Sequence, residues 1–158
     1  MRRRPLLFLV PAAALVLVLA LAGIATAAGH SSARKAASRQ AVVTTRKTKP
    51  GMILVDAQGR TLYLFEKDKN GKSACAGACA KAWPPLMTSG KPKVAGGANA
   101  KMLGTTHRAS GLQVTYNGHP LYLFFEDKQA GQTNGQGSTA FGAPWYVMGT
   151  NGNKITKG

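Results

Sequence analysis

The sequence predicts a mainly β domain, built from two pseudo-repeated antiparallel hairpin units with one short helix. Three observations predict this fold class: a duplicated strand, closely spaced turn residues and a single stretch of helical character. The duplication is plain, because GRTLYLFEKD at residues 59–68 returns as GHPLYLFFED at residues 118–127. Self-similarity of this kind indicates that one supersecondary unit is used twice.

Each copy of the unit has the pattern of a β-hairpin. In the first copy, the β-rich runs MILVD and TLYLFE flank AQGR; in the second, LQVTY and PLYLFF flank NGH. Asn117 and Gly118 favour a tight turn, because such a turn needs positive φ at both central positions. Further hairpins are expected where ASG joins GTTHR to LQVTY, and where GTNGN joins WYVM to KIT. The Gly-rich stretch from Ala130 to Pro144 is expected to be a long loop.

The duplicated strand is apolar on both faces. Side chains alternate along a strand, so one face of the first copy carries Leu62 and Leu64 and the other carries Tyr63 and Phe65. In the second copy one face carries Leu121, Leu123 and Phe125, and the other carries Tyr122 and Phe124. Strands of this composition are expected to be central and covered on both sides.

Other side chains near the strands have two interpretations. Asp68 and Asp127 lie where the strands end, and a carboxylate there is expected to cap the following turn. Four aromatic residues are expected to fill the β core, and a carbohydrate-binding surface is the alternative: Trp83, Tyr116, Trp145 and Tyr146.

The helical stretch is SACAGACAKAW, with Ser73 as its expected N-cap and the following Pro84 as its stop. It contains Cys75 and Cys79, the only cysteines of the chain. Residues four apart on a helix share one face, with Cα atoms about 6 Å apart, which is within disulfide range. An oxidising compartment favours a structural disulfide. A redox-active dithiol and half of a soft-metal site stay open as alternatives.

The N-terminal part of the chain has the features of an export signal. Three arginines precede a long apolar run that ends at Ala25-Thr26-Ala27, so residues 1–27 are predicted to be a signal peptide, with an uncleaved anchor as the alternative. Residues 28–49 are basic and lack aromatic side chains, which predicts a disordered basic tail. The β-repeat domain is expected at 50–150, with repeat 1 at about 50–90, repeat 2 at about 100–150, and a C-terminal end at 151–158.

Charge and residue content restrict the function. The chain carries 21 Lys and Arg against 5 Asp and Glu, a net charge of +16. For an exported protein this predicts an anionic cell-wall polymer or a membrane surface as partner, not specific nucleic acid; no protein partner can be named. Five carboxylates and no visible Ser/His/Asp set predict that the protein is not an enzyme.

One metal hypothesis depends on the cleavage site. Cleavage after Ala27 would leave Ala28-Gly29-His30 at the start of the chain, where the amine, two amides and the imidazole can bind Cu(II) or Ni(II) in a square plane. Coincidence in a flexible start is the alternative. Apart from this possible copper site at His30, no cofactor is expected.

The repeated residues resemble a known family, the bacterial secreted-repeat or predicted-lipoprotein family named for its Y-x-[FWY]-x-x-D motif. The motif residues are Tyr63, Phe65 and Asp68 in the first copy, and Tyr122, Phe124 and Asp127 in the second. The resemblance implies an extracytoplasmic repeat domain with no settled activity. The chain has no cysteine near its apolar segment, so a lipid anchor is not implied.

These observations lead to two functional hypotheses. The first is a secreted, envelope-associated, non-enzymatic β-repeat domain that binds anionic cell-surface components. The alternative is an extracytoplasmic redox or copper-handling protein that uses Cys75 and Cys79, with His30 as a possible ligand.

Overall fold

The computed structural model of the chain describes residues 40–157. The predicted signal peptide, His30 and the first part of the predicted basic tail lie outside the described residues. Within residues 40–157 the elements are, in chain order, β1 (Val42–Thr48), β2 (Gly51–Asp56), β3 (Tyr63–Phe65), α2 (Ala78–Ala82), β4 (Met87–Thr88), β5 (Lys93–Val94), η1 (Ala100–Met102), β6 (Leu103–Arg108), β7 (Gly111–Tyr116), β8 (His119–Pro120), η2 (Ala140–Gly142) and β9 (Trp145–Val147).

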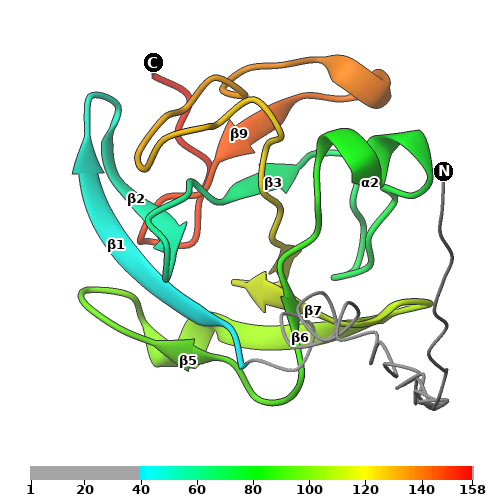
Figure 1. Ribbon diagram of the computed structural model, residues 1–158, viewed down its shortest axis with the longest axis horizontal. Helices are drawn as coiled ribbons and strands as arrows, with labels where there is room; N and C mark the ends of the chain where they lie inside the picture. The colour runs from blue at the N-terminus through cyan, green and yellow to red at the C-terminus, as the bar shows by residue number, and fades with distance from the viewer. Residues whose placement is uncertain (1–39, 158) are drawn as a thin grey trace, which may run out of the picture.

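The protein is mainly β, as predicted from the sequence, and its strands form three small sheets. The sheets have the orders β2-β1-β5, β3-β9 and β4-β7-β6, with β8 also paired to β7. All strand pairs are antiparallel except β1 with β5. The β1–β2 hairpin, the β6–β7 hairpin and the β3–β9 pair surround the interior (Figure 1).

Both predicted repeat hairpins form. In the first copy β2 turns back at Asp56, whose N–H donates to Arg60 O at 2.9 Å, and Leu62 N–H donates to Leu54 O at 3.0 Å. In the second copy β7 pairs with β8, and the turn between them has Asn117 at φ 49° and Gly118 at φ 77°. These left-handed values are the ones that a tight Asn-Gly turn requires, so this turn prediction is confirmed.

The strand β1 corrects the predicted tail. Residues 42–48 lie in the stretch expected to be disordered, yet β1 pairs with β2 from Val43 with Asp56 to Thr48 with Gly51. Val43 is fully buried. The prediction was wrong here because Arg46 and Lys47 stay exposed within the strand, while the rest of the strand is rich in Val and Thr, and β-branched residues favour strands.

The two repeats meet at their duplicated strands. Tyr63 N–H donates to Tyr122 O at 2.8 Å and Tyr122 N–H donates to Tyr63 O at 3.0 Å, so the equivalent residues form an antiparallel bridge. The predicted alternation sorts the side chains into two cores. The aliphatic core contains Leu62, Leu64, Leu121 and Leu123, and the aromatic core contains Tyr63, Phe65 and Tyr122. Phe125 is a correction, because it is 50% exposed instead of facing the aliphatic core.

The helix is shorter than predicted. It covers Ala78–Ala82 and begins after Gly77, whose φ of 57° is left-handed and interrupts any helix from Ser73. Ser73 is therefore not an N-cap. Its hydroxyl instead contacts Tyr122 and accepts a hydrogen bond from Cys75 N–H. The end of the helix agrees with the stop expected at Pro84.

Candidate functional site

Each tyrosine of the repeated motif donates a hydrogen bond to the aspartate of the other repeat. Tyr63 Oη lies 2.6 Å from Asp127 Oδ2, and Tyr122 Oη lies 2.7 Å from Asp68 Oδ2. The two bonds are related by the same pseudo-twofold arrangement as the bridge between the tyrosines. The motif thus fastens the two halves to each other, and we refer to these two hydrogen bonds as the crossed pairs.

The second oxygen of each aspartate orders the loop that follows it. Asp68 Oδ1 accepts from Ala74 N–H at 2.7 Å, and Asp127 Oδ1 accepts from Asn134 N–H at 2.9 Å. The expected capping role is therefore present, although the capped amides lie farther along the chain than an adjacent turn. One motif carboxylate thus fixes its own loop and the partner repeat at the same time.

Burial dominates the protonation of the crossed pairs. It raises the pKa of Tyr63 and Tyr122 well above the ordinary value near 10, and the neighbouring aspartate raises each further. Burial also raises the pKa of Asp68 and Asp127, while the hydrogen bonds that these carboxyl groups accept act in the opposite direction. The tyrosines remain protonated donors at neutral pH.

A stack of four aromatic rings crosses the interface between the repeats. Phe65 stacks on Trp145 at 3.9 Å between ring centroids, Trp145 stacks on Trp83 at 3.9 Å, and Trp83 stacks on Phe124 at 4.2 Å. Each phenylalanine therefore packs against the tryptophan of the other repeat. Trp83 and Trp145 are fully buried, so the prediction that they fill the core is confirmed.

Cys75 and Cys79 form a disulfide with their Cα atoms 5.3 Å apart. Cys75 precedes the helix, so the pair does not sit on one helical face as expected. The two residues are 1% and 6% exposed and belong to the aromatic core. Because thiol–disulfide exchange needs an attacking thiolate to reach a sulfur atom, this burial favours the structural interpretation of the pair.

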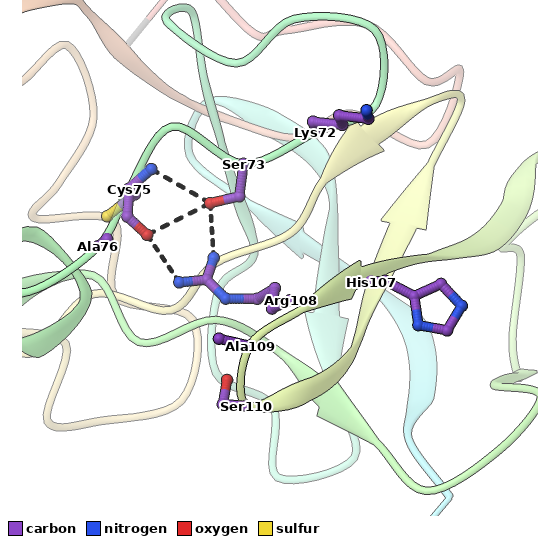
Figure 2. Close-up of a pocket in the computed structure, with 8 residues that line it drawn as sticks. All are labelled: Lys72, Ser73, Cys75, Ala76, His107, Arg108, Ala109 and Ser110. Atoms are coloured by element: carbon purple, nitrogen blue, oxygen red, sulfur yellow. Dashed lines mark hydrogen bonds between the residues drawn. The ribbon is translucent and has the colours of Figure 1, made fainter.

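A pocket of about 360 Å³ opens beside the disulfide. It lies between the loop that contains Lys72, Ser73, Cys75 and Ala76 and the end of the β6–β7 hairpin at residues 107–110 (Figure 2). Figure 2 shows the guanidinium of Arg108 reaching across to this loop. Arg108 Nη1 donates to Ser73 Oγ at 2.5 Å, and Nη2 donates to Cys75 O at 2.7 Å.

The pocket connects to one of the crossed pairs through Ser73. The Ser73 hydroxyl lies 2.7 Å from Tyr122 Oη, which also contacts Asp68. Arg108 Nη1 makes a further hydrogen bond of 2.8 Å to Gln113 Oε1, and the fully buried Gln113 donates from Nε2 to Leu121 O. The pocket wall is thereby tied to the duplicated strand.

The comparison with family models identifies the chain. It matches, at residues 44–87 and again at 104–148, a family described as a secreted repeat of unknown function. Together these two segments make up more than half of the chain. The chain belongs to this family. Each matched segment contains one copy of the Tyr-Phe-Asp motif, and the first begins within β1.

Membership of the secreted-repeat family confirms the resemblance inferred from the motif and supports an extracytoplasmic location. A search of curated proteins and a search of solved structures found no match. The family description leaves the ligand open, so functional inference depends on the residues of this chain.

The other sequence-predicted sites are not brought together. Among residues 40–157, no three His, Cys, Asp or Glu side chains are grouped to hold a metal ion. His30 lies outside that part of the chain, and the copper hypothesis stays a prediction. In the same described part, no helix has the length and apolar character needed to cross a membrane.

Sequence reasoning missed the role of Arg108. It identified the motif residues and the cysteines, but it gave this arginine no role. One pattern pointed to it: Arg108 and Gln113 lie on the two strands joined by the expected ASG turn, as diagonal neighbours whose long side chains can reach each other. The link to Ser73 joins segments far apart in the sequence and has no local signal.

Proposed function

We propose that this secreted-repeat protein is an envelope-associated, non-enzymatic domain that binds anionic components of the cell surface, either a wall polymer or a membrane surface. The observation that carries the proposal is that most of the few acidic side chains are held by fixed partners within the fold. All five acidic residues of the chain lie within the described residues, and four of them have fixed partners there: Asp56, Glu66, Asp68 and Asp127.

The acidic residues therefore neutralise little of the surface. Asp56 pairs with Arg60 at 2.6 Å and Glu66 pairs with Lys154 at 2.9 Å, and these are the two ion pairs among residues 40–157. Asp68 and Asp127 accept the hydrogen bonds of the crossed pairs between the repeats. Most of the lysines keep an uncompensated charge, which attracts anionic polymers and headgroups over the Debye length.

Salt dependence tests the proposal. We expect the purified chain to bind phosphatidylglycerol vesicles or an insoluble preparation of cell wall at low salt, and binding to weaken steadily as NaCl is added. The triple variant Lys91→Gln, Lys93→Gln, Lys101→Gln removes three exposed charges and should bind more weakly. The triple Lys→Arg variant at the same positions keeps the charge and is the matched control.

Two outcomes would contradict the proposal. One is absence of binding to both surfaces at low salt. The other is binding that does not respond to salt or to the three Gln substitutions. In either case electrostatic attraction would not be the basis of the function.

The alternative of redox or copper handling has a separate test. It depends on Cys75, Cys79 and His30, and the burial of the disulfide gives it less support than the binding function has. Thiol counting after mild reduction of the folded protein, and copper titration of the wild type against His30→Ala, would each detect it. A disulfide that exchanges readily in the native fold would favour the redox function.

A further inference from the structure

We propose that the pocket beside Arg108 is a specific binding site for a phosphate group. This inference deepens the proposed function and rests on it, because it names the anionic group that the surface would select. A lipid headgroup, a wall polymer and free phosphate all present this same group. Three side chains carry the proposal: Arg108, Lys72 and Ser110.

The guanidinium of Arg108 is held in place by neutral acceptors and makes no direct ion pair among residues 40–157, although the carboxylate of Asp68, outside the pocket, interacts with its charge. Its three hydrogen bonds end on a hydroxyl, a side-chain amide and a backbone carbonyl, which are all neutral acceptors. No carboxylate lines the pocket. The half-buried guanidinium is therefore a positive charge at a fixed position. An anionic ligand in the pocket would be its direct charge partner.

Arg108 also keeps donors for a ligand. A guanidinium has five N–H donors, and the three hydrogen bonds to Ser73, Gln113 and Cys75 leave its Nε–H and one Nη2–H without a partner among the described residues. Because its position is already fixed, little side-chain entropy is lost when a ligand binds.

The rest of the pocket supplies donors from other directions. Ser110 lines it from the β6–β7 turn, with its hydroxyl on the side of Arg108 in Figure 2, and Lys72 lines it from the loop. The ammonium of Lys72 is directed away from Arg108 in Figure 2, so this exposed, flexible side chain turns inward when it binds a ligand. A tetrahedral phosphate accepts hydrogen bonds in several directions, and lysine binds it as a point charge. A planar carboxylate would leave part of this donor set unused.

The loop that forms one wall is fixed on several sides. The disulfide ties Cys75 to Cys79, Asp68 accepts from Ala74 N–H, and Tyr122 holds Ser73. A wall that is already ordered is the condition for a selective site, since the donors need not be assembled when the ligand arrives.

The pseudo-symmetry of the repeats breaks at this pocket. At the crossed pair that contains Asp68, the hydroxyl of Tyr122 also contacts Ser73, which in turn accepts from Arg108. At the crossed pair that contains Asp127, the corresponding hydroxyl of Tyr63 instead accepts from the backbone N–H of Gly135 at 3.3 Å. Both halves hold their crossed pair, so fastening the repeats does not require Ser73 and Arg108. Their presence on one side points to an additional role.

Titration with inorganic phosphate, followed by the backbone amide NMR signals of the purified chain, tests the site. We expect saturable shifts centred on the amides of Ser73, Arg108 and Ser110. Lys72→Gln and Ser110→Ala should each weaken binding about tenfold, which is the loss for one charge-assisted hydrogen bond. Both positions are exposed, and neither side chain makes a hydrogen bond that the fold uses.

The matched control is Lys101→Gln, which changes net charge equally. Lys101 lies in η1, just before β6 begins, whereas the pocket lies at the other end of β6, about 20 Å away by strand rise. This variant should bind phosphate as the wild type does. Arg108→Lys keeps the charge and loses the planar fork, and it should weaken binding while the amide spectrum shows that the fold is intact.

Further binding experiments identify the source of the phosphate and distinguish the phosphate pocket from the general surface binding proposed above. If Lys72→Gln weakens binding to phosphatidylglycerol vesicles the phosphate is a headgroup, and if it weakens binding to a polyglycerol-phosphate chain the phosphate belongs to a polymer. Three results would contradict a phosphate site in the pocket while leaving salt-dependent surface binding intact. They are an equal loss of phosphate affinity in Lys72→Gln and Lys101→Gln, chemical shifts that do not saturate, and acetate binding as tight as phosphate binding. Absence of any low-salt binding would instead overturn the proposed function.

Discussion

At the scale of single residues, the Y-x-[FWY]-x-x-D motif is explained by an exchange of side chains. Tyr63 reaches the aspartate that ends the other duplicated strand, and Tyr122 does the same in return. Within each copy of the motif, the phenylalanine between the tyrosine and the aspartate, Phe65 or Phe124, stacks on the tryptophan of the opposite repeat. Each motif position therefore has a partner in the other half, which gives the spacing a physical reason.

Removing one tyrosine hydroxyl tests the crossed pairs. Tyr63→Phe leaves Asp127, which is 8% exposed, without its hydroxyl donor. We expect the free energy of unfolding, measured in urea, to fall by about 1–3 kcal/mol, the cost of an unsatisfied buried polar group. Tyr146→Phe is the control, because Tyr146 is not part of a crossed pair, and an equal loss in both variants would contradict the role of the motif.

The same tyrosines predict sensitivity to alkaline pH. Their pKa is raised in the folded state, so an unfolded tyrosine loses its proton near pH 10 while the folded one keeps it. The unfolded state then binds fewer protons, and stability present below about pH 10 is lost as the pH rises further. Tyrosinate absorbance followed together with circular dichroism checks this.

Two of the four tyrosines, Tyr63 and Tyr122, should ionise only as the β structure is lost. Ionisation of all four before any change in circular dichroism would show that the crossed pairs are open to hydroxide in the native state. The expected order of events follows from the burial that raises both pKa values.

At the scale of elements, a glycine sets the distance between the Gly-rich loop and the aromatic stack. A Cβ on Gly135 would lie 2.5 Å from Trp83 Cη2 and 3.1 Å from Phe124 Cγ. The backbone of the loop thus packs directly against Trp83 and Phe124. The sequence predicted a loop here but not its packing role.

Substitution by alanine tests this contact. Gly135→Ala must displace Trp83 or Phe124, and we expect it to lower the free energy of unfolding by about 1–3 kcal/mol, as overpacking does. The near-ultraviolet circular dichroism of the tryptophans should change as well. Gly90→Ala is the control, since nothing lies within 4 Å of its added Cβ and its φ is not left-handed. Equal stability of the two variants would count against the contact.

Local patterns predicted some elements well and others poorly. The strand alternation placed Leu62 and Tyr63 in different cores, and Asn117 with Gly118 gave the correct turn, because these features depend on neighbouring residues. The strand β1 was missed because the basic residues of its segment were taken as a sign of disorder, whereas its Val and Thr residues favour a strand that pairs with β2. The helix start was placed too early, since the left-handed Gly77 and the contacts of Ser73 with distant residues override local helix propensity.

At the scale of the whole molecule, the two repeats interlock, and we expect them to fold as one unit. The pairing of β3 with β9 and of β4 with β7 joins residues from different repeats. The crossed pairs and the aromatic stack do the same. The sequence duplication predicted the repeats, but this interlocking came only from the structure, because neither a sequence repeat nor its spacing states which copy a side chain contacts.

Separating the halves tests this interlocking. Fragments 40–97 and 98–157 each lose both inter-repeat strand pairings, half of each crossed pair and two of the four stacked rings. Size alone does not forbid folding, since many domains of about 55–65 residues fold alone. We expect each fragment by itself to give an unfolded circular dichroism spectrum, and an equimolar mixture to recover β structure with a cooperative urea transition. A cooperative transition in either isolated fragment would mean that a repeat is stabilised by its own contacts, and the crossed pairs would then join two finished domains instead of completing one.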